Sequence, residues 1–288
     1  MSPTANFGGL SEEYTSEASA KIVIVPVAYD VTSTWMKGAD KGPVAIIEAS
    51  ANMELYDIET DSEVYRKGIY TDTAIEGKFS PEDMVEKVSK KVFDYLKKDK
   101  FTVILGGEHS VSIGSIKAHV KKNAGLTVLQ LDAHSDLRDE YNGSKYNHAC
   151  VMARVKEMYP IVQVGIRSMD SSEKELMNRA NVFFAEDIYS KTDWIDKVVS
   201  KLTDKVYITI DLDVFDPSIM PSTGTPEPGG LLWYDVLKLL KAVSVKRDIV
   251  GFDVVELCPN EINKSPDFLA AKLIYKLLSY KYACGVQV

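Results

Sequence analysis

Cysteine is scarce in this sequence. Three cysteines, Cys150, Cys258 and Cys284, occur among 288 residues, and none forms a Cys-x-x-Cys pair. An odd number without that spacing argues against a disulfide framework or a zinc–thiolate site and is typical of a reducing compartment. We therefore expect a cytoplasmic location.

Long apolar runs and dense basic runs are also missing. No apolar run reaches the ~18 residues that a membrane-spanning helix needs, and residues 1–20 are polar without the core of a signal peptide. The net charge is −8, and lysine and arginine do not cluster. These absences predict a soluble protein for which nucleic acid and membranes are poor partners.

Short β-branched runs alternate with longer amphipathic stretches along the chain. The expected strands are 22–28, 68–70, 102–105, 126–131, 161–166, 182–184, 206–210 and 249–254. The expected helices cover about 43–55, 110–122, 147–158, 171–180, 192–202, 232–245 and 266–280, and one more opens at residue 80 with a serine cap and a proline. Strands with little polar alternation are buried on both faces. The pattern therefore predicts an α/β fold with a mostly parallel sheet of about eight strands, in a single domain over 21–288 behind an N-terminal arm of residues 1–20.

Polar residues follow directly after four of the expected strands. These segments are Gly-Gly-Glu-His-Ser (106–110), Asp-Ala-His-Ser-Asp (132–136), Asp-Leu-Asp-Val-Phe-Asp-Pro (211–217) and Glu256. In open parallel sheets, ligands bind beyond the carboxyl ends of the strands. We therefore expect these side chains to meet at one edge of the sheet.

The spacing of the acidic residues favours metal binding. Asp132, His134 and Asp136 would point to one side of an extended segment, as would Asp211 and Asp213. Clustered carboxylates repel one another unless a cation lies among them, and carboxylate with imidazole suits a borderline or hard divalent ion. The four aspartates carry four negative charges, which two divalent ions neutralise. The segments thus predict a binuclear metal site.

Each segment alone has a plainer interpretation. The two glycines at 106–107 lack the Lys-Ser/Thr of a phosphate-binding loop. An Asp-x-Asp after a strand also occurs in phosphatases with an aspartyl nucleophile, which would leave residues 132–136 unexplained. His109 alone could be a core histidine, and His119 is interpreted as a surface residue of the helix 110–122. Cys150 and Cys258 are interpreted as small buried residues. The coincidence of the motifs at three strand ends favours the metal site.

Together these segments resemble the three metal-binding signatures of the arginase/agmatinase (ureohydrolase) family. The resemblance covers nearly the whole chain from about residue 20 and includes Tyr29-Asp30, Gly38…Pro43, Gly224–Gly230 and Gly251–Pro259. It implies a three-layer α/β/α arginase-like fold, two Mn²⁺ per chain and assembly into homo-trimers or homo-hexamers.

The resemblance also implies roles for individual residues. His109, Asp132, Asp136 and Asp211 would hold one manganese, and Asp132, His134, Asp211 and Asp213 the other. His148 resembles the proton-shuttling histidine of the family, and Glu256 the carboxylate that receives the guanidinium of a small cationic substrate. A single-zinc deacetylase of similar fold and an inactive binding homologue are the alternatives, and the complete set of six ligand positions argues against both.

Residues 137–147 bear on the substrate, because agmatine and arginine differ only by the α-carboxylate. This segment lacks the Asn-plus-Ser-Gly-Asn arrangement that arginases share. Asp139 and Glu140 would repel a carboxylate, and Arg138 is expected to pair with them. Hydrolysis of agmatine to putrescine and urea is therefore the first choice. Arginine stays open, and so does guanidinobutyrate, since Ala149-Cys150 follows the histidine where many agmatinases have Gly-Thr.

Overall fold

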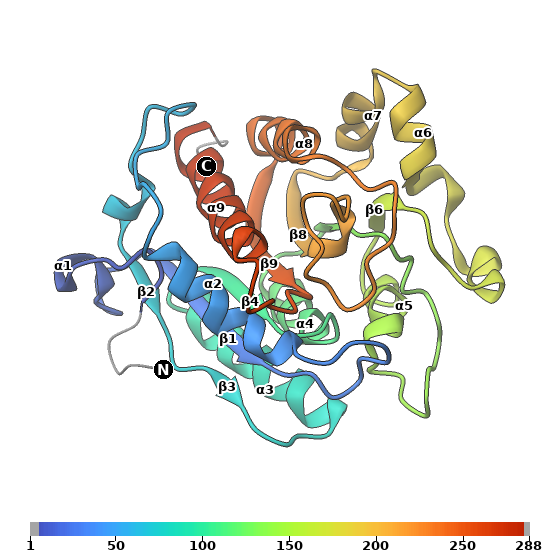
Figure 1. Ribbon diagram of the computed structural model, residues 1–288, viewed down its shortest axis with the longest axis horizontal. Helices are drawn as coiled ribbons and strands as arrows, with labels where there is room; N and C mark the ends of the chain where they lie inside the picture. Colours follow the sequence, from blue (N-terminus) through green and yellow to red (C-terminus); the bar gives the residue numbers. More distant parts are fainter. Residues whose placement is uncertain (1–5, 285–288) are drawn as a thin grey trace.

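A nine-stranded sheet lies at the centre of the molecule (Figure 1). The computed structural model describes residues 6–284. Within them the strand order is β2-β1-β4-β9-β8-β5-β6-β7, with β3 paired to β1, and each of these pairings is parallel. The strands are β1 (Ile22–Ala28), β2 (Ile69–Thr71), β3 (Ile75–Glu76), β4 (Phe101–Gly106), β5 (Thr127–Leu131), β6 (Ile161–Ile166), β7 (Val182–Phe184), β8 (Lys205–Asp211) and β9 (Asp248–Val255). The predicted parallel sheet is confirmed, and β3 is the strand that the sequence pattern did not indicate.

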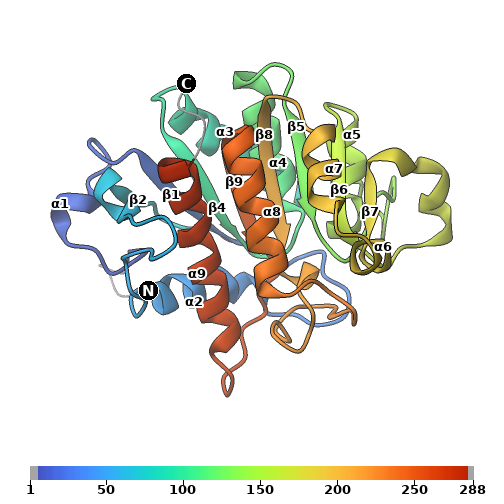
Figure 2. The ribbon, with the colours of Figure 1, turned by 90° about the horizontal axis from the view of Figure 1, so that it is seen from above.

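Helices cover both faces of the sheet, as Figure 2 shows. One face carries α2 (Gly42–Ser50), α7 (Trp194–Lys201), α8 (Trp233–Lys246) and α9 (Ser265–Ser279), and the other carries α3 (Pro81–Leu96), α4 (Val111–Lys122) and α5 (Val151–Lys156). Each layer buries its own hydrophobic core, with Ile46 and Leu273 in one and Met84 and Ile116 in the other. The three-layer α/β/α architecture is thus confirmed. No helix within residues 6–284 is both long enough and apolar enough to cross a membrane.

Local sequence accounts for the start and the buried face of α3. The Ser80 hydroxyl accepts a hydrogen bond from the Asp83 N–H at 3.1 Å, and Pro81 stands in the first turn, as predicted. Val88 and Val92, four residues apart on one helix face, are fully buried. The helix therefore docks along the sheet by its apolar side.

The strand order brings the polar segments together. β4, β9, β8 and β5 are consecutive neighbours in the middle of the sheet. Because they run in the same direction, their carboxyl ends share one edge, where Gly106, Val255, Asp211 and Leu131 end the four strands. The four predicted segments therefore leave the sheet side by side.

Several predicted helices differ in their bounds. The helix expected at 171–180 is a pair of short 3₁₀ turns, η4 (Ser171–Leu176) and η5 (Arg179–Asn181), and the one at 147–158 begins as η3 (His148–Cys150). The helix α6 (Ala185–Ser190) was not predicted. A capping box between Asp170 and Glu173 starts the first of these 3₁₀ turns.

The expected N-terminal arm packs onto the domain over its described part, residues 6–20. Phe7 is fully buried, and its N–H donates to the Thr71 hydroxyl at 2.9 Å. The N–H of Gly8 donates to the Ser50 hydroxyl at 2.8 Å, just before α1 (Glu12–Thr15). Residues 1–5 lie outside the described part. The boundary at residue 20 stays a prediction.

His119 is buried, so its interpretation as a surface residue is wrong. Its Nε2 lies 3.0 Å from the Thr102 hydroxyl, and its ring packs against that of Tyr207 with the centroids 4.8 Å apart. A Cβ at Gly251 would lie 2.4 Å from this ring, so glycine leaves the space that the imidazole fills. Burial lowers the pKa of His119 to about 3, which keeps the ring neutral near pH 7.

We predict that His119 makes the protein less stable in mild acid. The unfolded chain takes up a proton at this histidine with a pKa near 6.5, whereas the folded chain does not, so stability falls as the pH drops below 6.5. Between pH 7.5 and 5.5 the loss should be about 1.4 kcal/mol. Urea unfolding of the metal-free protein at both pH values measures it, with His119→Gln as the control. An equal pH dependence in both proteins would rule out His119 as the group responsible.

Candidate metal centre and active-site pocket

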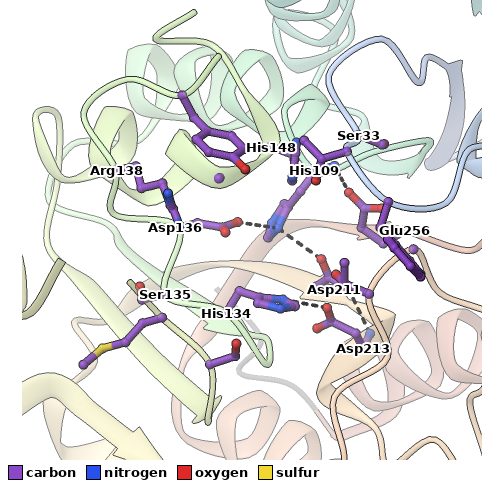
Figure 3. Close-up of a pocket in the computed structure, with 18 of the residues that line it drawn as sticks. Ser33, His109, His134, Ser135, Asp136, Arg138, His148, Asp211, Asp213 and Glu256 are labelled. Atoms are coloured by element: carbon purple, nitrogen blue, oxygen red, sulfur yellow. Dashed lines mark hydrogen bonds and ion pairs between the residues drawn. The ribbon is translucent and has the colours of Figure 1, made fainter. Parts of the chain in front are cut away.

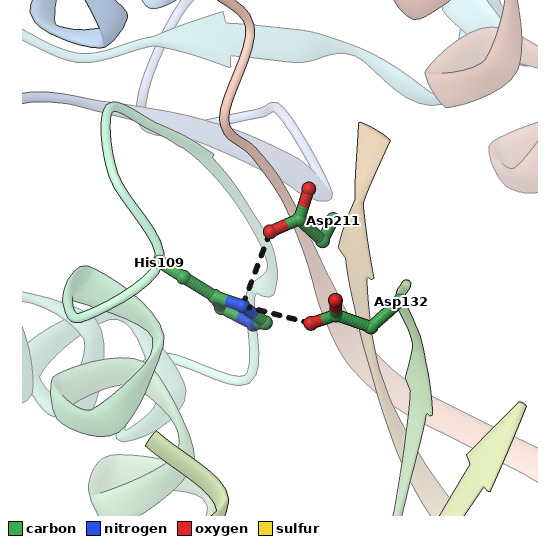
Figure 4. Close-up of side chains that lie close together, drawn as sticks. All are labelled: His109, Asp132 and Asp211. Carbon is green, nitrogen blue, oxygen red and sulfur yellow. Dashed lines mark ion pairs between the residues drawn. The ribbon is translucent and has the colours of Figure 1, made fainter. Parts of the chain in front are cut away.

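The six residues predicted as metal ligands lie together at the carboxyl edge of the sheet, where Figure 3 labels all but Asp132, which Figure 4 labels. His109 follows β4, Asp211 is the last residue of β8, and Asp213 lies in the 3₁₀ turn η6 (Leu212–Val214). The loop after β5 supplies the other three, which are Asp132, His134 and Asp136. Segments from three strand ends thus form one cluster.

One group of ligand atoms surrounds the ring of His109 (Figure 4). Its Nδ1 lies 3.1 Å from Asp132 Oδ2, 3.1 Å from Asp136 Oδ2 and 3.4 Å from Asp211 Oδ2. His109, Asp132 and Asp211 offer one ligand atom each within a spread of 4.8 Å, and all three are buried. This group could hold a metal ion.

A second group lies beside the first and shares Asp132 with it. The Nδ1 of His134 is 2.8 Å from Asp213 Oδ2 and 3.7 Å from Asp132 Oδ1. Asp132, His134 and Asp213 again offer one atom each within 4.8 Å. The two oxygens of Asp132 therefore face different imidazoles, as expected for a residue between two ions.

The backbone does not bring these side chains together in the way that the spacing suggested. Asp211 ends β8 and caps the 3₁₀ turn η6 that contains Asp213, so the chain leaves the strand between them, and Asp211 Oδ1 accepts from the Asp213 N–H at 2.9 Å. Asp136 has a positive φ of 52°, so the chain turns before it. The period-two argument is wrong for these two segments, because a turn, and not strand alternation, aims the carboxylates.

Electrostatics of the metal-free cluster show strong repulsion among its carboxylates. Burial, together with Asp213 and Asp136, raises the pKa of Asp132 to about 7. Burial alone would lower the pKa of His134, but the neighbouring carboxylates of Asp213, Asp132 and Asp136 raise it to about 11. The cluster therefore binds protons where divalent cations would otherwise supply the positive charge.

The chemistry of the donor set fits such cations. Among the described residues, the buried Nδ1 of His109 has no hydrogen-bond partner, although three carboxylates lie around it. Imidazole nitrogen with several carboxylate oxygens is a donor set for borderline to hard divalent metals. A metal ion would satisfy the buried nitrogen and the carboxylates at once.

Polar residues inside the strands orient the ligands, and sequence analysis missed them. The Nε2 of His109 lies 2.9 Å from the Thr209 hydroxyl, which donates to Asp253 Oδ1 at 2.6 Å. Gln130 in β5 donates to Asp132 Oδ2 at 2.7 Å. With Nε2 directed at Thr209, the Nδ1 of His109 faces the carboxylates. These three polar residues stand within otherwise apolar strands, and that position in the sequence could have identified them.

Arg167 ties the loop after β8 to the loop after β6. Its guanidinium donates to the carbonyl oxygens of Asp213 (2.5 Å), Glu227 (2.9 Å), Pro228 (3.1 Å) and Gly165 (3.1 Å). Such a set of acceptors fixes the backbone at Asp213 and at the glycine-rich segment after it. Arg167 thus supports one of the ligands without pointing into the cluster.

A pocket of about 280 Å³ opens above the cluster. Its lining includes both predicted catalytic residues, His148 and Glu256, and five of the six predicted ligands, which are His109, His134, Asp136, Asp211 and Asp213. Two further loops complete the wall, with Ser33–Met36 on one side and Ser168–Asp170 on another. The pocket thus joins the metal cluster to a space for a small molecule.

Glu256 is held rigidly at the pocket wall. It has a positive φ of 67°, and its Oε1 accepts from the His109 N–H at 2.7 Å. A Cβ at Gly224 would lie 3.6 Å from Oε2, so the second oxygen faces a wall without a side chain. Burial and the nearby Glu108 raise the pKa of Glu256. A cation in the pocket would stabilise its ionised form.

The glycine before Glu108 allows the close approach of two loops. A Cβ at Gly107 would lie only 2.0 Å from the carbonyl oxygen of Tyr29, so no other residue fits without moving the chain. Next to it, Asp30 Oδ2 accepts from the N–H groups of Gly38 (2.6 Å) and Ala39 (3.2 Å). Asp30 thereby closes the loop that presents residues 33–36 to the pocket.

The expected pairing of Arg138 with its acidic neighbours is wrong. Asp139 pairs with Arg154 and with Lys145 at 3.2 Å. Arg138 lies in the pocket wall instead, 3.7 Å from Asp170 and 3.9 Å from Glu173. Neither Asp139 nor Glu140 lines the pocket, so repulsion by these two carboxylates does not set the substrate. The acidic partners of Arg138 are instead Asp170 and Glu173, which lie more than thirty residues away in the sequence.

The predictions for the cysteines and for His148 come out differently from that for His119. Cys150 and Cys258 are buried, as predicted. His148 is half-buried at the pocket, with its Nδ1 3.3 Å from the Thr32 hydroxyl and its ring beside that of Tyr141. It therefore lines the same pocket as Glu256, and its catalytic role stays a prediction.

A parallel α/β/α sheet with clustered imidazole and carboxylate groups at its carboxyl edge is typical of metal-dependent enzymes of the α/β class. Comparison with known proteins gives the family.

The model of the Arginase family matches residues 20–279. The chain is similar to N(1)-aminopropylagmatine ureohydrolase of Synechocystis sp., with 38% identity over 94% of this chain and 92% of that protein. It is similar to agmatinase of Pyrococcus horikoshii, with 32% identity over 90% and 91% of the two chains. Among solved structures, agmatine ureohydrolase of Thermoplasma volcanium has a TM-score of 0.84 and 33% identity over 92% and 91% of the two chains.

The chain therefore belongs to the Arginase family. It is a hydrolase of the ureohydrolase type, which acts on carbon–nitrogen bonds of amidines.

We predict that the hydroxyl of Thr209 supports metal binding through His109. Thr209→Val keeps the shape of the side chain but removes the acceptor for His109 Nε2, so the affinity for a metal at this histidine should fall about 10- to 100-fold. Titration of the chelated protein with Mn²⁺ measures the change. Thr209→Ser keeps the hydroxyl and should bind nearly as the parent protein does. Equal affinities in all three proteins would show that Thr209 does not orient the ligand.

Proposed function

We propose that this protein hydrolyses the guanidino group of a small cationic amine, releasing urea, with two Mn²⁺ ions bound at the carboxyl edge of the sheet. The observation that carries the proposal is the pair of ligand groups that share Asp132 at the base of a pocket lined by His148 and Glu256. The donor set, oxygen and imidazole nitrogen without sulfur, is one that Mn²⁺ accepts.

Each ion has an assigned set of ligands in this proposal. One set is His109, Asp132, Asp136 and Asp211, and the other is Asp132, His134, Asp211 and Asp213. The short distances from His109 Nδ1 to three carboxylates support the first, and the contact between His134 and Asp213 supports the second. The presence of two groups argues against a single-zinc deacetylase, and the complete set of ligand residues argues against an inactive homologue.

The residues of the chain have separate tasks in the reaction. When bound, the two ions would supply a nucleophile from water at neutral pH. Glu256 would bind the guanidinium by charge-assisted hydrogen bonds and orient its carbon, since it lines the pocket and its Oε2 has no side chain in front of it at Gly224. The pocket walls from residues 33–36 and 168–170 would exclude bulk water around the reacting group.

His148 would move the proton that the leaving amine requires, because an amine cannot depart as an anion. Burial lowers the pKa of His148 below its usual value, and Asp136 offsets only part of that effect. The ring is then neutral near pH 7. It would accept a proton as the nucleophile forms its bond and donate that proton to the amine.

N1-aminopropylagmatine is the first candidate substrate, and agmatine, the first choice of the sequence analysis, is the second. The cationic amines share the guanidinobutyl group that the site would hold. An apolar rim favours the longer substrate, since Trp35, Met36 and Met169 line the pocket while remaining 76%, 46% and 40% exposed. Three relatives that are 36–38% identical bear the name N(1)-aminopropylagmatine ureohydrolase. Methylenes of an aminopropyl group would cover this rim.

Arginase and guanidinobutyrase activities are the remaining alternatives. Both substrates carry a carboxylate, and Arg138 is the cation in the wall that could receive it. Asp170 and Glu173 already lie within 4 Å of its guanidinium and offset its charge. This arrangement favours an amine over a carboxylate at that end. Assembly into trimers or hexamers and the cytoplasmic location stay predictions.

We predict that chelated protein releases no urea and regains the activity with Mn²⁺ at about two ions per chain. Asp132→Asn should bind less than one ion per chain and remain inactive, because it removes a ligand from both groups. His148→Asn is the matched control. It should keep both ions and lose about 10²- to 10⁴-fold in kcat. Elemental analysis that finds one zinc and no manganese in active protein would overturn the binuclear proposal.

We predict that both agmatines exceed arginine and guanidinobutyrate by at least about 100-fold in kcat/KM, because burial of an unneutralised carboxylate is unfavourable. N1-aminopropylagmatine should exceed agmatine, and Trp35→Ala should lower kcat/KM about tenfold for the longer amine but less for agmatine. Urea release from the four compounds with Mn²⁺ present gives the comparison. A preference for arginine would refute the assignment of substrate while leaving the metal chemistry intact.

A further inference from the structure

A chain of hydrogen bonds connects His148 to the buried carboxylate of Glu108, which is not one of the predicted metal ligands. The Thr32 hydroxyl lies 2.7 Å from Glu108 Oε2 and 3.3 Å from His148 Nδ1. The backbone N–H of His148 donates to the same hydroxyl at 3.0 Å. Glu108 is fully buried between Gly107 and His109, and the proposed function gives it no role. Thr32 therefore links a catalytic histidine to the interior.

The groups around Glu108 are all able to donate. Its Oε1 faces the Ser110 hydroxyl at 2.8 Å and the Thr32 N–H at 3.4 Å, and its Oε2 faces the Thr32 hydroxyl and the Ser110 N–H. Backbone N–H groups can only donate. Two N–H groups and two hydroxyls thus surround the two oxygens of Glu108, and each of these four groups donates to it. The hydrogen of the Thr32 hydroxyl therefore lies in the 2.7 Å bond to Oε2.

A hydroxyl has one hydrogen and two lone pairs, which determines what His148 must present. With its hydrogen given to Glu108, Thr32 can only accept from the His148 side. One lone pair accepts from the backbone N–H, and the other faces Nδ1. Nδ1 therefore carries a hydrogen, because two lone pairs would otherwise face each other. In the neutral ring, Nε2 is then the nitrogen with the lone pair.

We propose that Thr32, fixed by Glu108, is a positioning residue that holds His148 in the tautomer with hydrogen on Nδ1. Nε2 then accepts the proton from the nucleophile and returns it to the leaving amine. This proposal rests on the proposed function of His148, but the tautomer is a property of the protein without substrate.

Two readouts test the proposal with Thr32→Val, which removes the hydroxyl, and Thr32→Ser, which keeps it. The first is ¹⁵N NMR of histidine-labelled full-length protein loaded with diamagnetic Zn²⁺ at pH 8. The chain has four histidines, and His148→Asn identifies the signal. The parent protein and Thr32→Ser should show hydrogen on Nδ1 of His148, whereas Thr32→Val should show a mixture of tautomers. Thr32→Ala replaces Thr32→Val if the latter does not fold.

The second readout is urea release with Mn²⁺. Thr32→Val should lower kcat about 10- to 100-fold at unchanged KM and metal content, and Thr32→Ser should restore most of it. Hydrogen on Nε2 in the parent protein, or an unchanged kcat in Thr32→Val, would overturn the proposal. Loss of metal from Thr32→Val would also overturn it, since Thr32 would then support the cluster. A parent protein that releases no urea from guanidino compounds would instead refute the proposed function, and the NMR result would still decide the tautomer.

Discussion

Repulsion among buried carboxylates at one edge of the sheet is the constraint on which the rest of this structure depends. Asp132, Asp211 and Asp213 are each under 5% exposed, and water cannot screen their charges. In the metal-free chain, protons on His109 and His134 supply the opposing charge, because the carboxylates raise the pKa of both rings. Buried charges persist only when they are paired or bound to a cation. The strand order β4-β9-β8-β5 thus creates a demand for positive charge that the metal pair would meet.

The same device orients two imidazoles with different tasks. His109 contacts the Thr209 hydroxyl, which donates to the buried carboxylate of Asp253, and His148 contacts Thr32, which donates to Glu108. A hydroxyl suits this place because it donates on one side and accepts on the other, so a carboxylate fixes the hydrogen on a ring that it does not touch. His109 thereby directs Nδ1 at the cluster, and His148 directs Nε2 at the pocket. Thr209 lies in a strand and Thr32 in a loop, which suits the proposed roles of His109 as a metal ligand and of His148 as a group that exchanges protons.

Sequence analysis predicts the strands and the polar segments after them better than the side-chain contacts between distant parts of the chain. Uninterrupted apolar runs mark the strands because a parallel sheet is buried on both faces, and Asp132 and His109 stand out because charge directly after such a run is unusual. His119 was misjudged because a histidine in an amphipathic helix has no sequence mark for the space left by Gly251. The pairing of Arg138 with Glu173 was missed for a related reason. Asp139 is much nearer to Arg138 in the sequence than Glu173 is. Only the fold shows that Asp139 pairs with Arg154 and that Arg138 lies near Glu173.

The two ends of the pocket are built differently. One end contains the proposed hydrolytic residues, and the other contains the residues that would select the substrate. The metal end rests on ends of adjacent strands, whose geometry the sheet fixes. The outer end consists of loops far apart in sequence, around Trp35, Arg138 and Met169. Loops tolerate substitution because few buried contacts depend on them. Under the proposed function, a change of Trp35 or Arg138 would alter which amine or carboxylate the wall accepts without moving Asp132. Substrate choice could then change at the outer loops while the proposed hydrolytic centre at the strand ends stays the same.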